Sequence, residues 1–480
     1  MGWPGLVFGV VLALGTGWLL ARALTHSLPP SPGGRAFRLG LAALLGLGLG
    51  SLTSFAWRLA GGSMGEGYVL FDLATLVFVG AAAVAFLRAN RSSIPPAPPA
   101  GGGVDESARW SRFTARMLAA ALAISLVLSI GLFIETTRRA PHGQWDAVAV
   151  WNLHARFLYR AGASWRDMFA PELGASQPGY PLLLPATVAR LWAWGGESTF
   201  APALVAGLFT FSPVLVLGGA TAIAAGPAAG LGAALLLLGT PSWIRTGAAQ
   251  YADLAAGDFL LCAQASLLVA GSRGSARAGS DSLARGLLGA GGIALGFAAW
   301  TKDEGLAMAA VSVAVWSVGW WRTQGSPVFR RLAWVGAGAA APLLALLLFR
   351  VVLAPSTAQA LTTGQTAAGV AAKLLDPDRH SVVWSALARE APGAPFFLPV
   401  FAGAVAVLLG ARPGRMLRSA PLLAAVAMVL VYAMVFLATP QPLLWHLGTS
   451  ASRLLLQLWP TLLLGLFSAT EEFRTRADPR

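Results

Sequence analysis

Charged residues are scarce in this chain of 480 residues, of which Asp, Glu, Lys and Arg make up only 11%. A soluble domain usually has about a quarter of its residues charged, because water must cover its surface. Hydrophobic residues instead reach 56%, and the mean hydropathy is +0.66. The composition therefore excludes a water-soluble globular protein and predicts a chain that lipid covers over most of its surface.

Cysteine is almost missing too, because Cys262 is the single one and lies inside an apolar run. An internal disulfide is therefore impossible, and cysteine usage indicates nothing about the cell compartment. Glycine, by contrast, is abundant, with 56 residues. Small residues let helices approach closely in lipid, where side-chain packing drives association. This composition favours tightly packed membrane helices.

Long uncharged runs are what the chain has in place of charge, and the clearest are Gly40–Trp57, Met117–Ile134, Leu287–Trp300 and Leu332–Phe349. The longest approach the roughly 20 residues that cross the hydrocarbon core as a helix, and they do not alternate as barrel strands would. We therefore predict an all-α polytopic membrane protein. About thirteen transmembrane helices are expected, at residues 3–22, 39–57, 68–87, 115–135, 199–222, 228–246, 254–271, 285–301, 305–321, 332–353, 395–411, 419–438 and 453–470.

The basic residues gather in alternate loops. No basic residue precedes the first run and Arg22 follows it, so we expect no cleaved signal and an outer N-terminus. Alternation then places the excess of 34 Lys and Arg over 20 Asp and Glu in one set of loops, with Arg22, Arg35, Arg38, Arg88, Arg91, Arg109, Arg112, Arg116, Arg273, Arg277, Arg285, Arg322, Arg330, Arg331, Arg412, Arg415, Arg418, Arg474, Arg476 and Arg480. That side is predicted to be the cytoplasm and to hold the C-terminus. Anionic lipid accounts for the positive charge, so no nucleic-acid partner is predicted.

The chain is expected to divide at a Pro/Gly-rich cytoplasmic linker, residues 89–114, which contains IPPAPPAGGG. Residues 1–88 before it form a three-span membrane extension. Residues 115–470 after it form the main membrane module, and residues 471–480 form a cytoplasmic tail. Two outer loops, 135–198 and 354–394, are too long to lack structure, so each should contain juxtamembrane helices.

The first of these loops has two helical patterns. Trp145, Trp151 and Leu158 belong to an apolar repeat at three- and four-residue spacing, which predicts an amphipathic helix on the membrane surface. A second helix is expected over residues 180–194, where the two prolines of PGYPLLLP disfavour a straight crossing of the membrane.

The few outer charges lie at the ends of the apolar runs; they are Asp146, Asp253, Lys302, Asp303, Glu304 and Arg453. Charge at a bilayer boundary is costly, so such residues usually serve a definable contact. An isolated one is most often solvated or ion-paired, and the neighbours of Lys302 could simply neutralise it. Asp72 and Asp258, each a turn inside a run, are expected to make structural polar contacts. His142 and His154 have no partner at metal-ligand spacing, so these histidines do not support a metal site.

Five segments carry a family resemblance; they are WDAVAVWNLHARFLY, PGYPLLLPATVARLW, QYADLAAGDFLL, AAWTKDEG and RLLLQLWP, all between Ala115 and Ala469. In this order, and on one side of the membrane, they resemble the polyprenyl-phosphate-dependent glycosyltransferases of the GT-C superfamily. Bacterial protein O-mannosyltransferases and lipid A aminoarabinose transferases are the most similar members. The resemblance implies a GT-C-like helix arrangement in the bacterial inner membrane, with a periplasmic N-terminus and an active site that faces the periplasm.

The resemblance also implies a role for each matching residue. Asp146 corresponds to the catalytic base, and Asp253 to a second acid that orients the acceptor or holds a divalent cation such as Mg²⁺ or Mn²⁺. Lys302 and Arg453 correspond to positions that contact the lipid-linked phosphate. Supporting roles fall to Arg156, Tyr180, Glu304 and His446. The implied reaction moves a sugar from a polyprenyl-phosphate donor to a hydroxyl of a glycan, lipid or protein, with inversion at the anomeric carbon.

Two other classes of protein stay open. A transporter or lipid flippase would have ionisable groups near the middle of the bilayer, often in related halves, whereas these runs are uncharged at their centres and show no internal repeat. A non-catalytic scaffold would leave Asp146, Asp253 and Lys302 far apart. The glycosyltransferase prediction therefore requires these three residues around one outward-opening cavity.

Overall fold

The computed structural model describes residues 2–26, 28, 30–89, 106–271, 281–324, 328–355, 364–390 and 397–470. Most of the predicted linker and all of the predicted tail at 471–480 lie outside these residues. Within the described ranges the fold is helical, and the one isolated backbone bridge joins Ala411 to Thr470.

The helices follow one another with short connections. The first four are α1 (Gly2–Leu24), α2 (Pro32–Leu59), α3 (Glu66–Ala89) and α4 (Glu106–Arg139). An irregular segment follows, with η2 (Ala147–Trp151), α5 (Asn152–Arg160), η3 (Gly162–Phe169), η4 (Pro171–Ser176) and α6 (Leu183–Gly195). The rest are α7 (Phe200–Ala225), α8 (Pro227–Leu238), α9 (Pro241–Ala248), α10 (Ala252–Gly271), α12 (Asp281–Thr301), α13 (Asp303–Gln324), α14 (Val328–Val352), α15 (Ala367–Leu375), α16 (Pro377–Arg389), α17 (Phe397–Leu408), α18 (Pro413–Met416), α19 (Ala420–Ala438) and α20 (Leu443–Phe467).

Ten helices of the described chain are long and apolar enough to cross a membrane. Helices α8 and α9, bent by 58° at their junction, add an eleventh if they are one broken span. The protein is therefore an α-helical, multi-pass membrane protein. The predicted number of thirteen is not reached by this criterion, because the spans expected at 305–321 and 395–411 correspond to α13 and α17, which are not among these helices.

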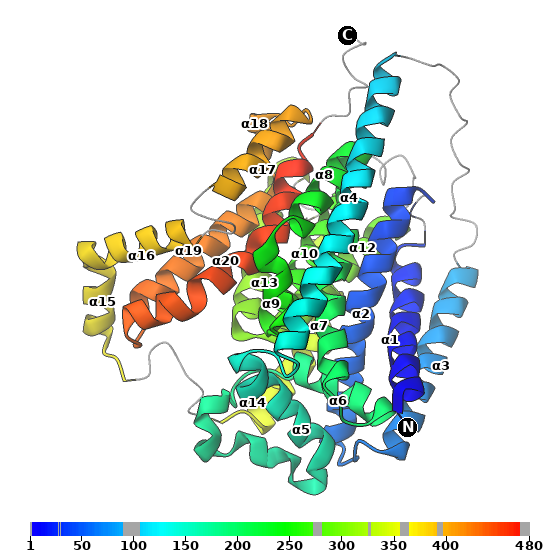
Figure 1. Cartoon of the computed structure of the whole chain (residues 1–480), viewed down its shortest axis with the longest axis vertical. Helices are drawn as coiled ribbons and strands as arrows, with labels where there is room; N and C mark the ends of the chain where they lie inside the picture. The colour runs from blue at the N-terminus through cyan, green and yellow to red at the C-terminus, as the bar shows by residue number, and fades with distance from the viewer. Residues whose placement is uncertain are drawn as a thin grey trace.

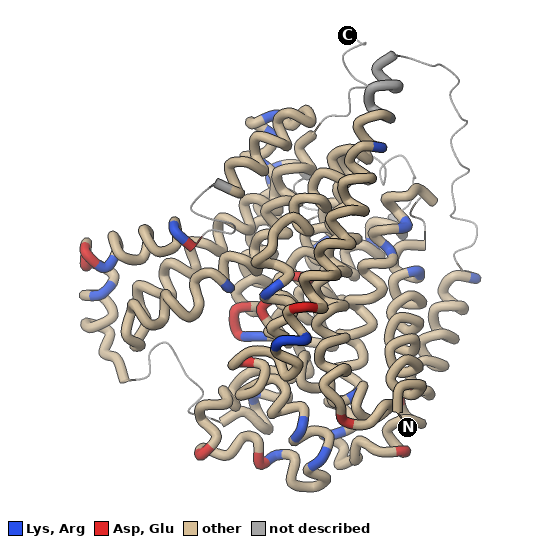
Figure 2. Tube along the Cα trace, in the orientation of Figure 1, with Lys and Arg blue, Asp and Glu red and all other residues tan. Residues whose placement is uncertain are grey.

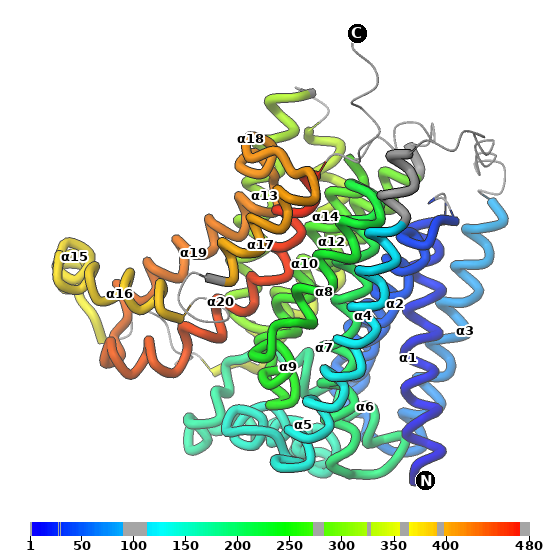
Figure 3. Tube along the Cα trace, turned by 45° about the horizontal axis from the view of Figure 1, so that its top comes forward, coloured from blue at the N-terminus to red at the C-terminus, as the bar shows by residue number. Residues whose placement is uncertain are grey.

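The ends of the helices sort to two faces. In Figure 1 the start of α1 and the segment from α5 to α6 lie at one end of the molecule, and α18 lies at the other. Figure 3 gives the same arrangement, with α1–α3 on one flank and α15–α16 on the opposite flank. The two long predicted outer loops contain α5–α6 and α15–α16, respectively.

Glycine permits the closest helix contacts. A Cβ on Gly17 of α1 would overlap the carbonyl oxygen of Ala42 on α2, and a Cβ on Gly46 would overlap that of Ala13. The same holds between α12 and α14, where Gly292 lies against the Val335 carbonyl. Such contacts maximise van der Waals packing, which is the main attraction between helices in lipid.

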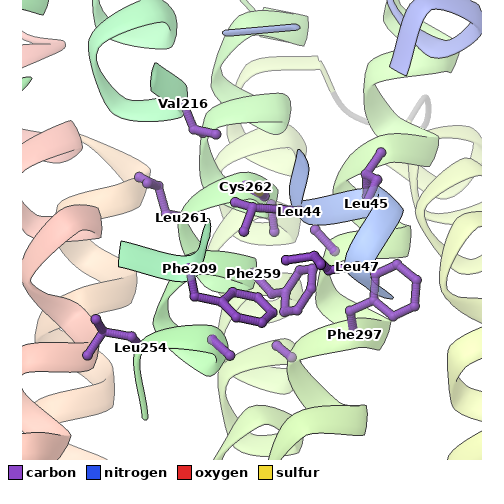
Figure 4. Packing of buried hydrophobic residues seen from close by; sticks show 14 of the residues in the cluster. Leu44, Leu45, Leu47, Phe209, Val216, Leu254, Phe259, Leu261, Cys262 and Phe297 are labelled. Carbon is purple, nitrogen blue, oxygen red and sulfur yellow. The ribbon is translucent and has the colours of Figure 1, made fainter. Parts of the chain in front are cut away.

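The core lies where α2, α7, α10 and α12 meet. Leu44 and Leu47 of α2 pack beside Phe209 of α7, Phe259 of α10 and Phe297 of α12, all of them buried (Figure 4). The rings of Phe259 and Phe297 lie 5.2 Å apart, and those of Phe209 and Phe259 6.0 Å apart. Helix α2, from the predicted extension, is thus packed against helices of the main module.

A buried ion pair also joins the first helices to α6. Asp72 of α3 accepts from the guanidinium of Arg190 at 2.8 Å and from the indole nitrogen of Trp194 at 2.8 Å. Arg190 donates in addition to the carbonyl of Gly9 in α1 at 2.9 Å. The expected structural contact of Asp72 is confirmed. Because both charges are buried, each depends on the other for compensation.

Asp258 does not make the structural contact expected of it. It is fully buried in α10, and neither of its carboxylate oxygens has a hydrogen-bond partner in the described part of the chain. The physical reason is its surroundings, since the helix at this level is packed in apolar side chains such as Leu254 and Leu261.

Candidate functional site: a buried charge cluster

Five ionisable side chains from four separate segments meet; they are the buried Asp253 and Lys302 and the partly exposed Asp146, Glu304 and Arg453. We call these five residues the charge cluster. Lys302 Nζ lies 3.2 Å from Asp253 Oδ1 and 3.2 Å from Glu304 Oε1. Arg453 pairs with Asp146 and lies 3.6 Å from Asp253 Oδ2. Figure 2 shows acidic and basic positions gathered in the middle of the molecule, beside the segment that contains α5.

Asp146 is carried to the cluster by the turn that follows α4. Gly143 adopts a left-handed backbone with φ of +77°, and a Cβ there would lie 2.7 Å from the carbonyl oxygen of Ala249. The amide of Gln144 donates to that same carbonyl at 3.1 Å. Glycine is therefore required for the turn to dock on the α9–α10 junction. Asp146 follows directly and sits at the start of η2.

Asp253 enters the cluster from the first turn of α10. Gln250, two residues before that helix, has a φ of +63°, and its side chain is tied to Pro141 and Asn152 by hydrogen bonds of 3.2 and 3.0 Å. Left-handed glutamine is strained unless its surroundings hold it, and such strain is frequent at functional sites. The side chain of Asp253 is only 2% exposed.

Lys302 occupies the single residue between α12 and α13. This connection is so tight that a Cβ on Gly305 would overlap the carbonyl of Ala298. Burial alone would lower the pKa of the Lys302 ammonium, but the Asp253 and Glu304 carboxylates outweigh it and hold that pKa well above its ordinary value. Lys302 is therefore a permanent positive charge.

Aromatic rings face both cations. Lys302 Nζ lies 5.8 Å from the centre of the Tyr180 ring, which stacks on Trp151 at 5.4 Å. Arg453 lies 4.9 Å from the centre of the Tyr251 ring. Ring faces attract cations and leave the ammonium and guanidinium edges available to anions. The structure thus brings Tyr180 to the cluster, whereas Tyr251 was not singled out in the sequence.

The other two predicted supporting residues lie elsewhere. Arg156 of α5 makes its ion pair with Glu197, at 3.1 Å, and with no member of the charge cluster in the described residues. His446 lies in the same helix as Arg453, where its Nδ1 is 2.9 Å from the Thr439 hydroxyl and its ring is 4.9 Å from that of Phe436. Among the described residues, neither is joined to the five cluster side chains by a hydrogen bond or an ion pair.

Two residues that the sequence analysis missed complete the site. Gln457 donates to Asp253 Oδ1 at 2.8 Å and accepts from the hydroxyl of Tyr432 at 3.0 Å. Both side chains are buried. Gln457 lies four residues after Arg453, on the same face of α20. A single polar residue in the apolar stretch RLLLQLWP was the signal that could have identified it.

The donor set does not suit a metal ion held by the protein. Asp146 and Asp253 share Arg453, and Asp253 and Glu304 share Lys302, so a cation already lies between each pair of carboxylates. In the described ranges no group of three His, Cys, Asp or Glu residues is placed to hold one metal ion. A divalent cation would have to displace the guanidinium and obtain most of its ligands from water or substrate. We therefore assign no catalytic step to a metal.

The charge balance of the cluster decides what it can bind. Three carboxylates face two cations, so one negative charge is in excess. Asp253 Oδ2 and Glu304 Oε2 accept no hydrogen bond within the described residues. Both oxygens are buried, so they are acceptors that the described residues leave unfilled. An anion can bind only if a cation exchanges one of its carboxylate partners for it.

Comparison with known proteins gives no relative, since no family model, curated protein or solved structure matches this chain. The function must therefore be argued from the sequence pattern and the geometry of the charge cluster.

Proposed function

We propose that this protein is an integral membrane glycosyltransferase, with the GT-C-like arrangement that its sequence segments resemble. It would move a sugar from a polyprenyl phosphate to an acceptor hydroxyl at the outer, periplasmic face of the bacterial inner membrane. The observation that carries the proposal is the contact network of Asp146, Asp253, Lys302 and Arg453. A fixed pair of cations beside carboxylates is what displacement of a phosphate by a hydroxyl needs.

The cations serve the leaving group. The bond from the anomeric carbon to the phosphate oxygen breaks, and its electron pair goes to that oxygen, so the phosphate charge grows from −1 toward about −2. Lys302 and Arg453 stabilise this charge as it develops. They act most strongly where water is excluded, and the Lys302 side chain is only 7% exposed.

Asp146 serves the acceptor. It takes the proton of the acceptor hydroxyl while the hydroxyl oxygen forms the new bond to the anomeric carbon, which inverts in this single displacement. In the resting arrangement Arg453 is paired with Asp146. When the donor phosphate takes over Arg453, the carboxylate is freed to act as base. Donor binding would thus free Asp146 to act as the base. Asp253, which contacts both cations, would hold Lys302 and Arg453 in position.

The decisive experiment incubates the purified chain with a panel of polyprenyl-phosphate sugars and measures release of polyprenyl phosphate. Asp146→Asn is expected to lower the rate by 10²–10⁴-fold, the usual contribution of a general base. Donor binding should be unchanged or tighter, because the carboxylate that competes with the donor phosphate for Arg453 is gone. Asp167→Asn, an exposed aspartate in η3, is the matched control and should keep full activity. Turnover by Asp146→Asn at the wild-type rate would remove Asp146 as the base.

A transporter or lipid flippase is the second candidate, and Asp258 favours it. Asp258 lies in the first half of α10 and has no hydrogen-bond partner among the described residues. A buried ionisable residue within a spanning helix is typical of proton-coupled transport. Asp258→Asn should abolish substrate movement across vesicles if this candidate is correct. It should leave release of polyprenyl phosphate unchanged if the glycosyltransferase proposal is correct.

A further inference from the structure

A second polar site lies beside the charge cluster, in a cavity of about 270 Å³ between α5 and the turn from α6 to α7. We call it the α5 cavity. Its walls include His142, Asn152, Arg156, Arg160, Trp192 and Glu197. The volume is just under the roughly 300–1,000 Å³ of typical small-molecule pockets, so the cavity suits a fragment such as one sugar or headgroup unit.

Two arginines and one glutamate set the charge of this cavity. Arg160 binds the Glu197 carboxylate through two nitrogens, and Arg156 binds it through Nε at 3.1 Å. One positive charge is therefore in excess. In the described chain the two terminal nitrogens of Arg156 make no hydrogen bond, and that side chain is 31% exposed. They are available to a ligand that enters the cavity.

The donors are arranged along one face of α5. Asn152, Arg156 and Arg160 are four residues apart, so their side chains form a stripe on that helix. Asp146 lies ten residues before Arg156 in the same helical segment, roughly 15 Å away at 1.5 Å per residue. This reach exceeds a single sugar ring. An acceptor anchored at Arg156 must therefore be longer than one sugar unit to bring a hydroxyl to Asp146.

Hydrogen bonds also link the cavity to Gln250, which precedes Tyr251 beside the charge cluster. Asn152 donates to the side chain of Gln250 at 3.0 Å, and Gln250 donates to the carbonyl of Pro141, next to His142 in the cavity wall, at 3.2 Å. Tyr251, the next residue, carries the ring that faces Arg453. A narrow second cavity lies against Asn152, Gln250 and Tyr251 and shares Asn152 with the α5 cavity. The α5 cavity and the charge cluster are therefore positioned by the same residues, Asn152, Gln250 and Tyr251.

We propose that the α5 cavity is the acceptor subsite and that it selects acceptors with an anionic group. Arg156 would bind the phosphate or carboxylate of the acceptor, while the hydroxyl to be glycosylated lies near Asp146. The assignment of an acceptor rests on the proposed glycosyl transfer, but anion binding in the cavity does not. Glu197 then has a specific part: it competes with the ligand for Arg156 and keeps the empty cavity from binding anions nonspecifically.

The test measures binding of three probes to the purified full chain in a glycoside-free detergent. The probes are glucose 6-phosphate, glucuronate and neutral glucose, so that phosphate and carboxylate are distinguished. Each anionic probe that the site accepts should bind about tenfold or more tightly than glucose, the usual value of a charged hydrogen bond. Arg156→Gln should abolish this preference, and Arg156→Lys should keep part of it. Arg139→Gln, an exposed arginine of α4, is the matched control and should keep all of it.

Glu197→Gln distinguishes a ligand site from a structural ion pair. Removing the competing carboxylate should tighten binding of the anionic probes, opposite in sign to Arg156→Gln. If Arg156→Gln and Glu197→Gln both weaken binding, or if wild type shows no preference for anions, the proposal is wrong.

A transfer assay then separates this proposal from the proposed function. With a phosphorylated acceptor, Arg156→Gln should raise KM about tenfold and leave kcat and donor hydrolysis near wild type. Anion binding with the predicted signs but no polyprenyl phosphate release from any donor would refute glycosyl transfer and keep the site. Transfer without any anion preference would refute the site alone.

Discussion

Asp253 is the residue on which the charge cluster depends, because Lys302 and Gln457 both donate to its Oδ1 and Arg453 lies beside its Oδ2. Buried carboxylates need such complete compensation, since an unpaired charge in a low-dielectric interior is strongly destabilising. The neutral Gln457 adds a hydrogen bond without altering the charge. We infer that it is a positioning residue, which holds Asp253 between the two cations.

Gln457→Leu tests this role. It leaves Asp253 without one donor and the Tyr432 hydroxyl without an acceptor, so stability should fall by about 1–3 kcal/mol. In the assay of polyprenyl phosphate release, kcat should fall by a larger factor than KM changes. A merely structural role would not give this difference. Tyr432→Phe removes only the outer hydrogen bond and should cost less in both measurements. Equal losses of stability and activity in Gln457→Leu and Tyr432→Phe would contradict the inference that Gln457 itself positions Asp253.

His154 gives stability a dependence on pH. Its ring is fully buried, with Nε2 3.2 Å from the Ser176 hydroxyl, and burial lowers the pKa of the imidazole to about 4. Unfolded histidine binds a proton below its ordinary pKa of about 6.5, so acid favours the unfolded state. Stability is therefore full above pH 6.5 and falls as the pH drops toward 4.

The expected loss is up to about 3 kcal/mol over that range. It should appear as a lower unfolding temperature in detergent at pH 5 than at pH 7. His154→Gln should remove most of the difference, whereas His142→Gln, an exposed histidine, should retain it. An unchanged pH profile in His154→Gln would assign the effect to other groups.

At the scale of elements, the contact of α10 with α20 determines whether the site forms. Gly257 lies against the backbone of Gln457, and a Cβ there would lie 2.9 Å from Gln457 Cα. One face of α20 carries Arg453 and Gln457 to Asp253 only because this approach is so close. Gly257→Ala should therefore push the helices apart, lowering stability and polyprenyl phosphate release together.

Gly131→Ala is the matched control for that substitution. Gly131 is a helical glycine of α4 with open space around its Cα, and alanine favours helix by up to about 1 kcal/mol. The control should be neutral or stabilising. If Gly257→Ala behaves in the same way, α20 does not depend on close packing to supply its side chains.

Helix α19 is also held at its end by the α15–α16 segment. Arg379 donates to the carbonyls of Leu437 and Phe436, and Lys373 donates to that of Thr439. Cations at a helix C-terminus satisfy free carbonyls and complement the helix dipole. The α15–α16 segment, in the second predicted outer loop, thus holds the connection between α19 and α20 in place.

At the scale of the whole molecule, membrane orientation is the prediction to test. The chain has one cysteine, the buried Cys262, so a Cys262→Ser background permits single-cysteine labelling. Asp167→Cys lies in η3 at the end of the molecule that holds the start of α1, and Gly414→Cys lies in α18 at the other end. In intact cells an impermeant thiol reagent should label Asp167→Cys and spare Gly414→Cys. The reverse pattern would place the charge cluster on the cytoplasmic side.

Much of the fold follows from the sequence because lipid imposes a simple rule, namely that long uncharged runs become helices. The ends of the individual spans are harder to predict from the sequence, since α8 and α9 bend at Gly239–Pro241 and α17 is only 12 residues long. Contacts between distant side chains were harder still. Gln457 and Tyr251 carry no charge, and although both lie in segments of the family resemblance, only the packing of α20 on α10 shows that they contact the charge cluster. The sequence predicts a supporting role for Arg156, whereas in the structure this side chain pairs with Glu197.

The buried pair of Asp72 and Arg190 has a consequence for chains shortened at the N-terminus. Deleting α1–α3 would remove Asp72 and the Gly9 carbonyl together, and would leave the Arg190 guanidinium uncompensated inside α6. Loss of one buried partner costs about 3–5 kcal/mol. Truncation alone would then destabilise α6 because of the uncompensated charge, whether or not α1–α3 have a function of their own. Pairing the deletion with Arg190→Met would separate that electrostatic penalty from any true need for the leading helices.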